Sequence, residues 1–272
     1  MENTEQTVTY QQPKMPEINA VSFATLRGTL KAGIDDFLKA PLFGLFFGGI
    51  YAVGGWIIIA SLNYLDMPWM IIPVAIGFPL IGPFIAVGLY EVSRRIAAGK
   101  PLVWSEVLFV MFHQRERQLS WMAFVVLFVF WMWIYQVRLL LALFLGFKSF
   151  SSLPKFVEVI TTTQEGLLFL GVGTISGAVL SFVLFSATVI SMPLLLDREL
   201  DFVSAMICSF KAVFKSPVPM LSWGVMVVVL AFIGMAPAFF GLIVVLPVLG
   251  HATWHLYEAV IGSENPAGTG KG

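Results

Sequence analysis

Charged residues are scarce in this chain, and their scarcity excludes an ordinary water-soluble domain. Only 12% of the 272 residues are Asp, Glu, Lys or Arg, while 58% are hydrophobic. A soluble globular domain carries about 25% charged residues, so the polar side chains here are too few to cover a water-exposed surface. The sixteen basic and sixteen acidic residues cancel, which leaves no net field that would favour nucleic acid as a partner.

Residues that carry covalent or metal chemistry are equally rare. The single cysteine, Cys208, excludes an intrachain disulfide and a zinc site built on several cysteines. The chain has only three histidines, and no Ser/His/Asp or Cys/His set has the spacing expected for nucleophilic catalysis. We therefore expect a protein that is not an enzyme and that needs no cofactor.

Long runs without charge are abundant, and they predict the architecture. A membrane-spanning helix needs about 20 apolar residues to cross a hydrocarbon core of about 30 Å. The longest run, 216–257, would be about twice too long as a single helix, so it must turn back near 234–237. The sequence therefore predicts an all-α membrane bundle with six transmembrane helices, at 42–63, 68–90, 119–139, 167–195, 219–235 and 238–258.

Polar segments flank the expected membrane domain, which covers residues 20–262. Residues 1–19 lack the basic and apolar regions of a cleavable signal peptide. Residues 263–272 are polar and rich in glycine. We expect both end segments to be disordered.

The basic residues predict the orientation in the membrane. Most of the sixteen Lys and Arg residues fall in segments that the six-span topology places on one side, and only Lys148 and Lys155 fall on the other. Because cytoplasmic loops are enriched in Lys and Arg, we expect both termini to be cytoplasmic, in a bacterial inner membrane. Arg138 lies within the third span, where it either has a function or extends to the headgroups.

Three segments have the pattern of an amphipathic helix that precedes a pair of spans. The first, 22–39, has an N-cap serine at Ser22 and continues into Lys39-Ala40-Pro41, and the second, 201–215, continues in the same way into Lys215-Ser216-Pro217. A third and weaker copy is 103–117. The second span of each pair ends in a similar tripeptide: Leu89-Tyr90-Glu91, Leu195-Leu196-Asp197 and Leu256-Tyr257-Glu258. We therefore predict three repeats of one unit, an interfacial helix followed by a transmembrane hairpin.

Three longer motifs carry a family resemblance. They are Gly82-Pro83-Phe84 with Val87-Gly88-Leu89-Tyr90-Glu91, the octapeptide at 191–198, and Leu246-Pro247-Val248-Leu249-Gly250-His251-Ala252-Thr253-Trp254-His255-Leu256-Tyr257. Over about residues 20–262 the chain resembles an uncharacterised family of bacterial integral membrane proteins, a domain of unknown function. Some members are labelled as cytochrome c oxidase subunits. Three histidines are too few for the haems and copper of the catalytic subunit, so that label implies an accessory or assembly role at most.

Polar residues near the cytoplasmic ends of the second spans are the candidate site. A carboxylate at a helix C-terminus opposes the helix dipole and needs a nearby cation. We therefore predict one mixed-charge cluster that binds a ligand or a partner, formed by Glu91, Asp197, Arg198, His251, His255 and Glu258. Ordinary ion pairing at the membrane interface is the alternative.

His251 and His255 lie one turn apart on one helical face. Two neutral imidazoles at this spacing can share a metal ion or bind haem, and hydrogen bonding to neighbouring helices is the alternative. The leading hypothesis is a non-enzymatic inner-membrane protein that acts in the lipid bilayer through protein partners, such as a respiratory complex. The two alternatives are a small transporter or channel, and a haem- or metal-binding protein that uses the two histidines.

Overall fold

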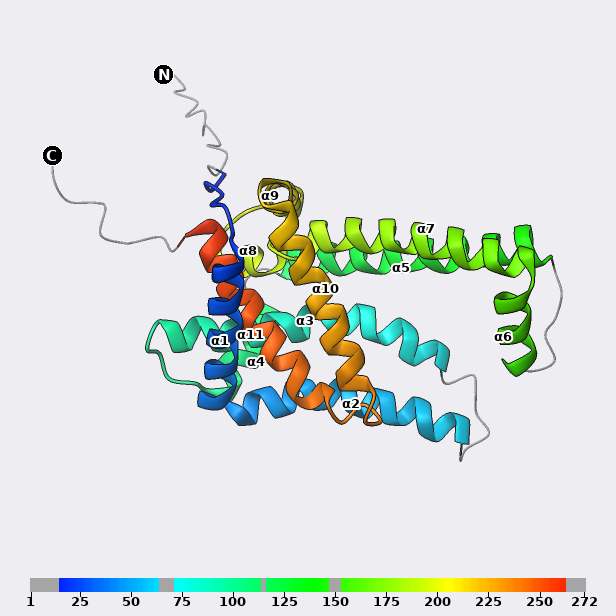
Figure 1. The fold of residues 1–272 in the computed structure, drawn as a ribbon. Helices are drawn as coiled ribbons and strands as arrows, with labels where there is room; N and C mark the ends of the chain where they lie inside the picture. Colours follow the sequence, from blue (N-terminus) through cyan, green and yellow to red (C-terminus); the bar gives the residue numbers. More distant parts are fainter. Residues whose placement is uncertain (1–14, 64–70, 114–115, 147–152, 263–272) are drawn as a thin grey trace, which may run out of the picture.

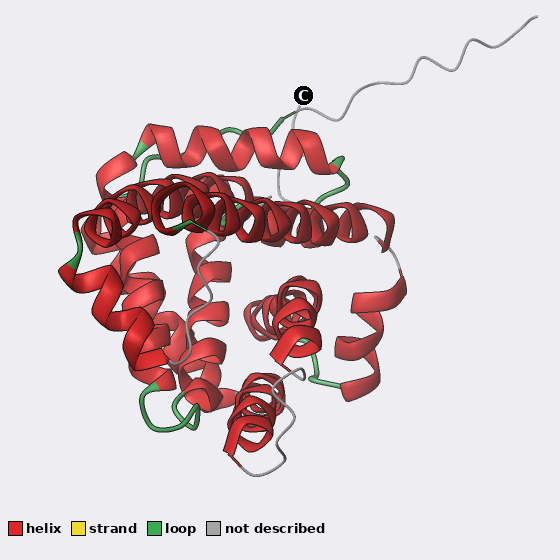
Figure 2. Ribbon diagram, turned by 90° about the vertical axis from the view of Figure 1, so that its right-hand side faces the viewer, coloured by secondary structure: helices red, strands yellow, loops and turns green. Residues whose placement is uncertain are grey.

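The fold is entirely helical in the part of the chain that the computed structural model describes, residues 15–63, 71–113, 116–146 and 153–262 (Figure 2). This confirms the all-α fold class. The expected disorder of residues 1–14 and 263–272 concerns segments outside this part. The helices are α1 (Phe23–Lys39), α2 (Pro41–Asn63), α3 (Ile71–Ala97), α4 (Trp104–His113), α5 (Glu116–Leu145), α6 (Leu153–Thr162), α7 (Gln164–Thr188), α8 (Ser191–Asp197), α9 (Phe202–Lys215), α10 (Pro217–Met235) and α11 (Leu242–Ile261).

Four helical stretches are long and apolar enough to cross a membrane, and this supports an integral membrane protein. Among the described residues they are Pro41–Ser61, Ser120–Leu145, Gln164–Asp197 and Pro217–Met235. They match four of the six expected spans. The long run 216–257 folds back as predicted, because α10 ends at Met235 and α11 begins at Leu242. α3 and α11 occupy the positions of the other two expected spans.

Helices form at both of the stronger amphipathic segments, as α1 and α9. Ser22 caps α1 by accepting a hydrogen bond from the Thr25 backbone N–H. The sequence pattern predicts one apolar face for α1, but its apolar side chains are divided between inside and outside. The side chains of Phe23, Ile34 and Leu38 are exposed, while the buried face consists of Leu26, Thr29, Gly33 and Asp36.

α1 packs closely on α11 and lies crosswise to α2 (Figure 1). At Gly33 the two backbones meet, since a Cβ atom there would lie 2.6 Å from the Ala252 nitrogen and 2.7 Å from the Val248 oxygen. The preceding segment also follows α11, where the Asn19 N–H donates to the Val260 carbonyl. A residue without a side chain is therefore what allows this close crossing.

α4 and α9, the helices at the other two amphipathic segments, also pack against the bundle. α4 packs against α3, and α9 packs against α7 and α8. The second helices of the three pairs also contact one another, because α3 touches both α8 and α11, and α8 touches α11. The main hydrophobic core lies around this junction and includes Trp223, Trp254, Tyr257 and Leu194.

α5 and α7 run side by side as a pair (Figure 1). In the most apolar part of α5 only 6% of the residues are buried, and aromatic side chains such as Trp121, Phe128 and Tyr135 are exposed. In a bilayer this surface is available to lipid or to another membrane helix.

Candidate functional site

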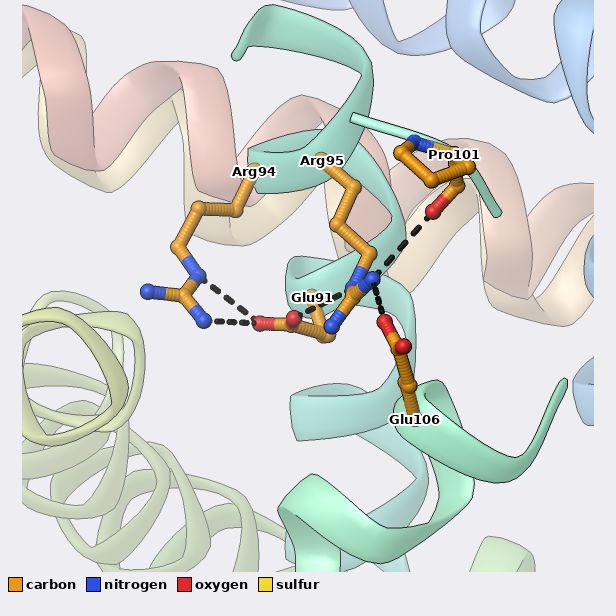
Figure 3. Close-up of polar contacts among 5 residues, drawn as sticks. All are labelled: Glu91, Arg94, Arg95, Pro101 and Glu106. Atoms are coloured by element: carbon orange, nitrogen blue, oxygen red, sulfur yellow. Dashed lines mark hydrogen bonds and ion pairs between the residues drawn. The ribbon is translucent and has the colours of Figure 1, made fainter. Parts of the chain in front are cut away.

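Glu91 of α3 is fully buried and has two arginine partners one turn further along the same helix (Figure 3). Arg94 Nε donates to Glu91 Oε2 and Arg95 Nε donates to Glu91 Oε1, both at 2.7 Å. Arg95 also donates to the Pro101 carbonyl oxygen at 3.2 Å and to the Glu106 carboxylate of α4. The cations that lie next to Glu91 in the sequence are therefore its ion-pair partners.

This ion-pair network links α3 to α4 through Arg95. Partial burial disfavours the guanidinium charge, but hydrogen bonds to Glu91 and Glu106 outweigh it and raise the pKa of Arg95 above its ordinary value. Two carboxylates and two guanidinium groups balance each other. Each of the four groups is ion-paired. The network therefore stabilises the helix junction and offers no free acid or base.

His255 of α11 lies between two carboxylates. Its Nε2 is 2.7 Å from Asp36 Oδ2, and its Nδ1 is 2.9 Å from Glu258 Oε2. Asp36 belongs to α1 and is 3% exposed, and Lys39 Nζ lies 3.7 Å from its other oxygen. Asp36 is not among the site residues predicted from sequence, because its neighbours Ile34 and Phe37 fit the apolar face predicted for this segment.

His251, one turn earlier on α11, is tied to α3. Its Nδ1 is 2.8 Å from Ser93 Oγ, and both side chains are fully buried. Burial raises the pKa of Asp36, but the hydrogen bond from His255 and the nearby Ser93 hydroxyl outweigh burial and hold that pKa below its ordinary value. Asp36 is thus a buried carboxylate that joins α1 to α11, while the Ser93–His251 pair joins α3 to α11.

Asp197, at the end of α8, accepts a hydrogen bond of 2.7 Å from the Tyr257 hydroxyl of α11. Its neighbour Arg198 donates to the Gly262 carbonyl at 3.2 Å. These contacts bring the ends of α8 and α11 together.

Comparison with known protein families identifies a membrane family. Residues 71–197 match the model of the DUF2189 family, which is described as "predicted integral membrane protein". The match covers α3 to α8, just under half of the chain. It confirms the resemblance to a membrane family of unknown function. No curated protein and no solved structure matches the chain.

The DUF2189 match contains part of the candidate site and excludes the rest. Glu91, Ser93 and Asp197 lie within it, while Asp36 and the polar residues of α11 lie outside. The hydrogen bonds described above form four sets: around Glu91, around Asp36 and His255, between Ser93 and His251, and between α8 and α11. His255 and Glu258 contact each other, and the single larger cluster stays a prediction.

The geometry of the histidine pair does not favour a shared metal ion. Both ring nitrogens of His255 are already within hydrogen-bonding distance of carboxylates. Within the described ranges, no group of three or more His, Cys, Asp and Glu residues is placed to hold a metal ion. Arg138 is exposed on α5, where its long side chain can extend towards the headgroups.

Proposed function

We propose that this chain is a non-enzymatic membrane protein that acts by binding a transmembrane helix of a protein partner between α5 and α7. The observation that carries the proposal is a groove between these helices, formed by two adjoining pockets of about 360 and 340 Å³. Both pockets are lined by Trp133, Gly177 and Ser181, which makes the groove continuous. We call it the α5–α7 groove.

Small residues line one wall of the α5–α7 groove at four-residue intervals. Gly173, Gly177 and Ser181 follow one another on α7. Small residues at this spacing let a second helix backbone approach closely, which is how many transmembrane helices associate. Small residues at this spacing are by themselves typical of packing between transmembrane helices.

Polar side chains in the groove favour a helix over a lipid chain as its occupant. Gln136 of α5 and Thr174 and Ser181 of α7 all line the groove. A polar group facing hydrocarbon is unfavourable, whereas polar side chains of adjacent transmembrane helices form hydrogen bonds with one another. A partner helix that carries a polar residue satisfies Gln136, and an acyl chain does not.

Co-purification in mild detergent tests this proposal, using the tagged full chain from its native membranes. We expect a specific membrane protein to be enriched with the wild-type chain, and Gly177→Leu to reduce its recovery at least tenfold by filling the groove. Gly171→Leu is the matched control, because Gly171 is also on α7, has open space within 4 Å of an added Cβ, and does not line the groove. Recovery of the wild-type chain alone, or equal recovery with both variants, would contradict the proposal.

The proposal extends to the kind of partner that is bound. The resemblance suggests a respiratory complex, which the chain would assist or help to assemble in a bacterial inner membrane. Enrichment of respiratory subunits in the co-purified material supports that version. Enrichment of unrelated membrane proteins would contradict it and leave the groove as the binding site.

The six spans and three repeats belong to the proposal as well. The packing of the amphipathic helices supports them, because each contacts the second helix of another pair. α1 contacts α11, α4 contacts α3, and α9 contacts both α7 and α8. Equivalent positions of α1 and α9 are also buried. Thr29, Gly33, Asp36 and Ala40 correspond, with a constant spacing of 176, to Ala205, Ser209, Ala212 and Ser216. With six spans both termini lie on one side, and reporter fusions at residues 1 and 272 test whether that side is the cytoplasm.

A further inference from the structure

The outward face of α1 carries a stripe of exposed side chains that is apolar at its ends and basic in its middle. From the N-terminal end, the stripe consists of Phe23, Arg27, Lys31, Ile34 and Leu38. Their spacing of three and four residues places them on one face of the helix. The opposite face of α1 packs on α11, so the stripe is directed away from the protein.

α9 carries a similar stripe. It consists of Val203, Ile207, Lys211 and Phe214, and all four are exposed. Beyond each stripe the chain turns into the next helix, where two more apolar side chains are exposed: Leu42 and Leu45 in α2, and Val218 and Leu221 in α10. Phe214, Val218 and Leu221 lie 176 positions after Leu38, Leu42 and Leu45. The same kind of surface therefore occurs twice in the bundle.

The direction of α1 relative to α2 places the first stripe at the membrane surface. α2 contains the apolar stretch Pro41–Ser61, which is long enough to cross a bilayer, and α1 lies crosswise to it (Figure 1). A helix in this orientation inserts its apolar side chains among the acyl chains. Long basic side chains on the same face can extend to the lipid headgroups.

The exposed surfaces of α1 and α9 carry an excess of positive charge. α1 has three basic residues, Arg27, Lys31 and Lys39, and all three are exposed. Its two acids are Asp35 and Asp36, of which Asp36 is buried. α9 contains two lysines and no acid. Basic residues close to a membrane surface attract lipids with a net negative charge.

α6 differs from these helices in charge. It lies at the far end of the α5–α7 pair from α9 (Figure 1). Its Lys155 pairs with its Glu158 at 3.2 Å, and α6 contains no other charged residue. The positive excess is therefore a property of α1 and α9 and is not shared by every short amphipathic helix of the bundle.

We infer that the stripes of α1 and α9 bind the headgroups of anionic phospholipids, whose acyl chains pack along the exposed starts of α2 and α10. Arginine and lysine form charge-assisted hydrogen bonds with phosphate oxygens. A zwitterionic headgroup has its own cation beside the phosphate and gains less from such a surface. The inference goes beyond the partner-binding function, because the stripes lie on α1 and α9 rather than in the α5–α7 groove, and either proposal can fail without the other.

Native mass spectrometry of the full chain tests the inference. The chain is extracted in mild detergent from vesicles of equal phosphatidylglycerol and phosphatidylcholine, and the lipids that stay bound are counted. We expect the wild-type chain to retain about threefold more of the anionic lipid. Arg27→Gln with Lys31→Gln should lower this ratio about twofold, and adding Lys211→Gln should lower it further. Arg27→Lys with Lys31→Arg keeps both charges and should keep the wild-type ratio.

Arg138→Gln with Lys155→Gln is the matched control. It also removes two positive charges from exposed positions, but on α5 and α6, so it should leave the ratio unchanged. Because Arg27 and Lys31 are exposed, an unchanged melting temperature is expected for their double variant and shows that it is folded. A wild-type ratio near one, an unchanged ratio in that variant, or an equal fall in the control would overturn the inference. No further fall with Lys211→Gln would exclude α9 from the lipid-binding surface.

Discussion

Gly33→Ala is expected to lower the thermal stability of the protein markedly, because it forces α1 away from α11. The added Cβ would lie 2.6 Å from the Ala252 nitrogen, 2.7 Å from the Ala252 Cβ and 2.7 Å from the Val248 oxygen. Two of these are backbone atoms of α11, which no change of rotamer can move. Overpacking of this kind costs about 1–3 kcal/mol of unfolding free energy, and the Asp36–His255 contact on the same face would lengthen as well.

Gly28→Ala is the control, because Gly28 is on the same helix but is exposed and has nothing within 4 Å of an added Cβ. Alanine favours a helix over glycine by about 1 kcal/mol, so this variant should be as stable as the wild-type chain or more stable. Thermal unfolding of both variants in the same detergent measures the difference. If the two melting temperatures move together, α1 does not depend on close contact with α11.

The positions of the long apolar helices could be predicted from the sequence because the bilayer sets the length of an apolar helix. The turn between α10 and α11 falls next to 234–237 for this reason. The helix ends are less exact, since α3 continues to Ala97 and α5 to Leu145, past the expected 90 and 139. Local signals were also sufficient where both partners are close in sequence. Ser22 caps the first turn of α1, and Arg94 and Arg95 pair with Glu91 because three and four residues bring side chains together on a helix.

The contacts between distant helices could not be predicted in this way. Asp36 and His255 are 219 positions apart, and no spacing rule connects them. The amphipathic pattern of α1 was itself misleading, since in a membrane protein the apolar side chains can face lipid while small and polar residues face the protein. Thr29, Gly33 and Asp36 share that inner face, and small or polar residues repeating on one face were the available signal.

Two regions of the molecule are therefore distinct in chemistry and in place. The junction of α1, α3 and α11 is polar and buried, while the α5–α7 groove is mostly apolar and open. A variant in one region should leave the other unchanged. Ser93→Ala should therefore retain partner recovery.

Glu91→Gln is expected to destabilise the protein by about 3 kcal/mol, because it leaves Arg94 without its counter-charge and Arg95 with Glu106 alone. Glu91 is fully buried and binds Arg94 and Arg95 with separate carboxylate oxygens. Arg94 is 38% exposed and can turn to water, but Arg95 is only 13% exposed. The expected loss is therefore at the lower end of the range measured for broken buried pairs.

Glu158→Gln tests whether burial, rather than the loss of any ion pair, causes this effect. Glu158 pairs with Lys155 at 3.2 Å on α6, with side chains 61% and 58% exposed, and an exposed pair contributes about 0–1 kcal/mol. Both variants remove one negative charge, so a general effect of net charge would appear equally in the two. Chemical unfolding in mixed micelles gives the two free energies. A Glu91→Gln loss no larger than that of Glu158→Gln would show that the α3–α4 junction does not rely on the buried carboxylate.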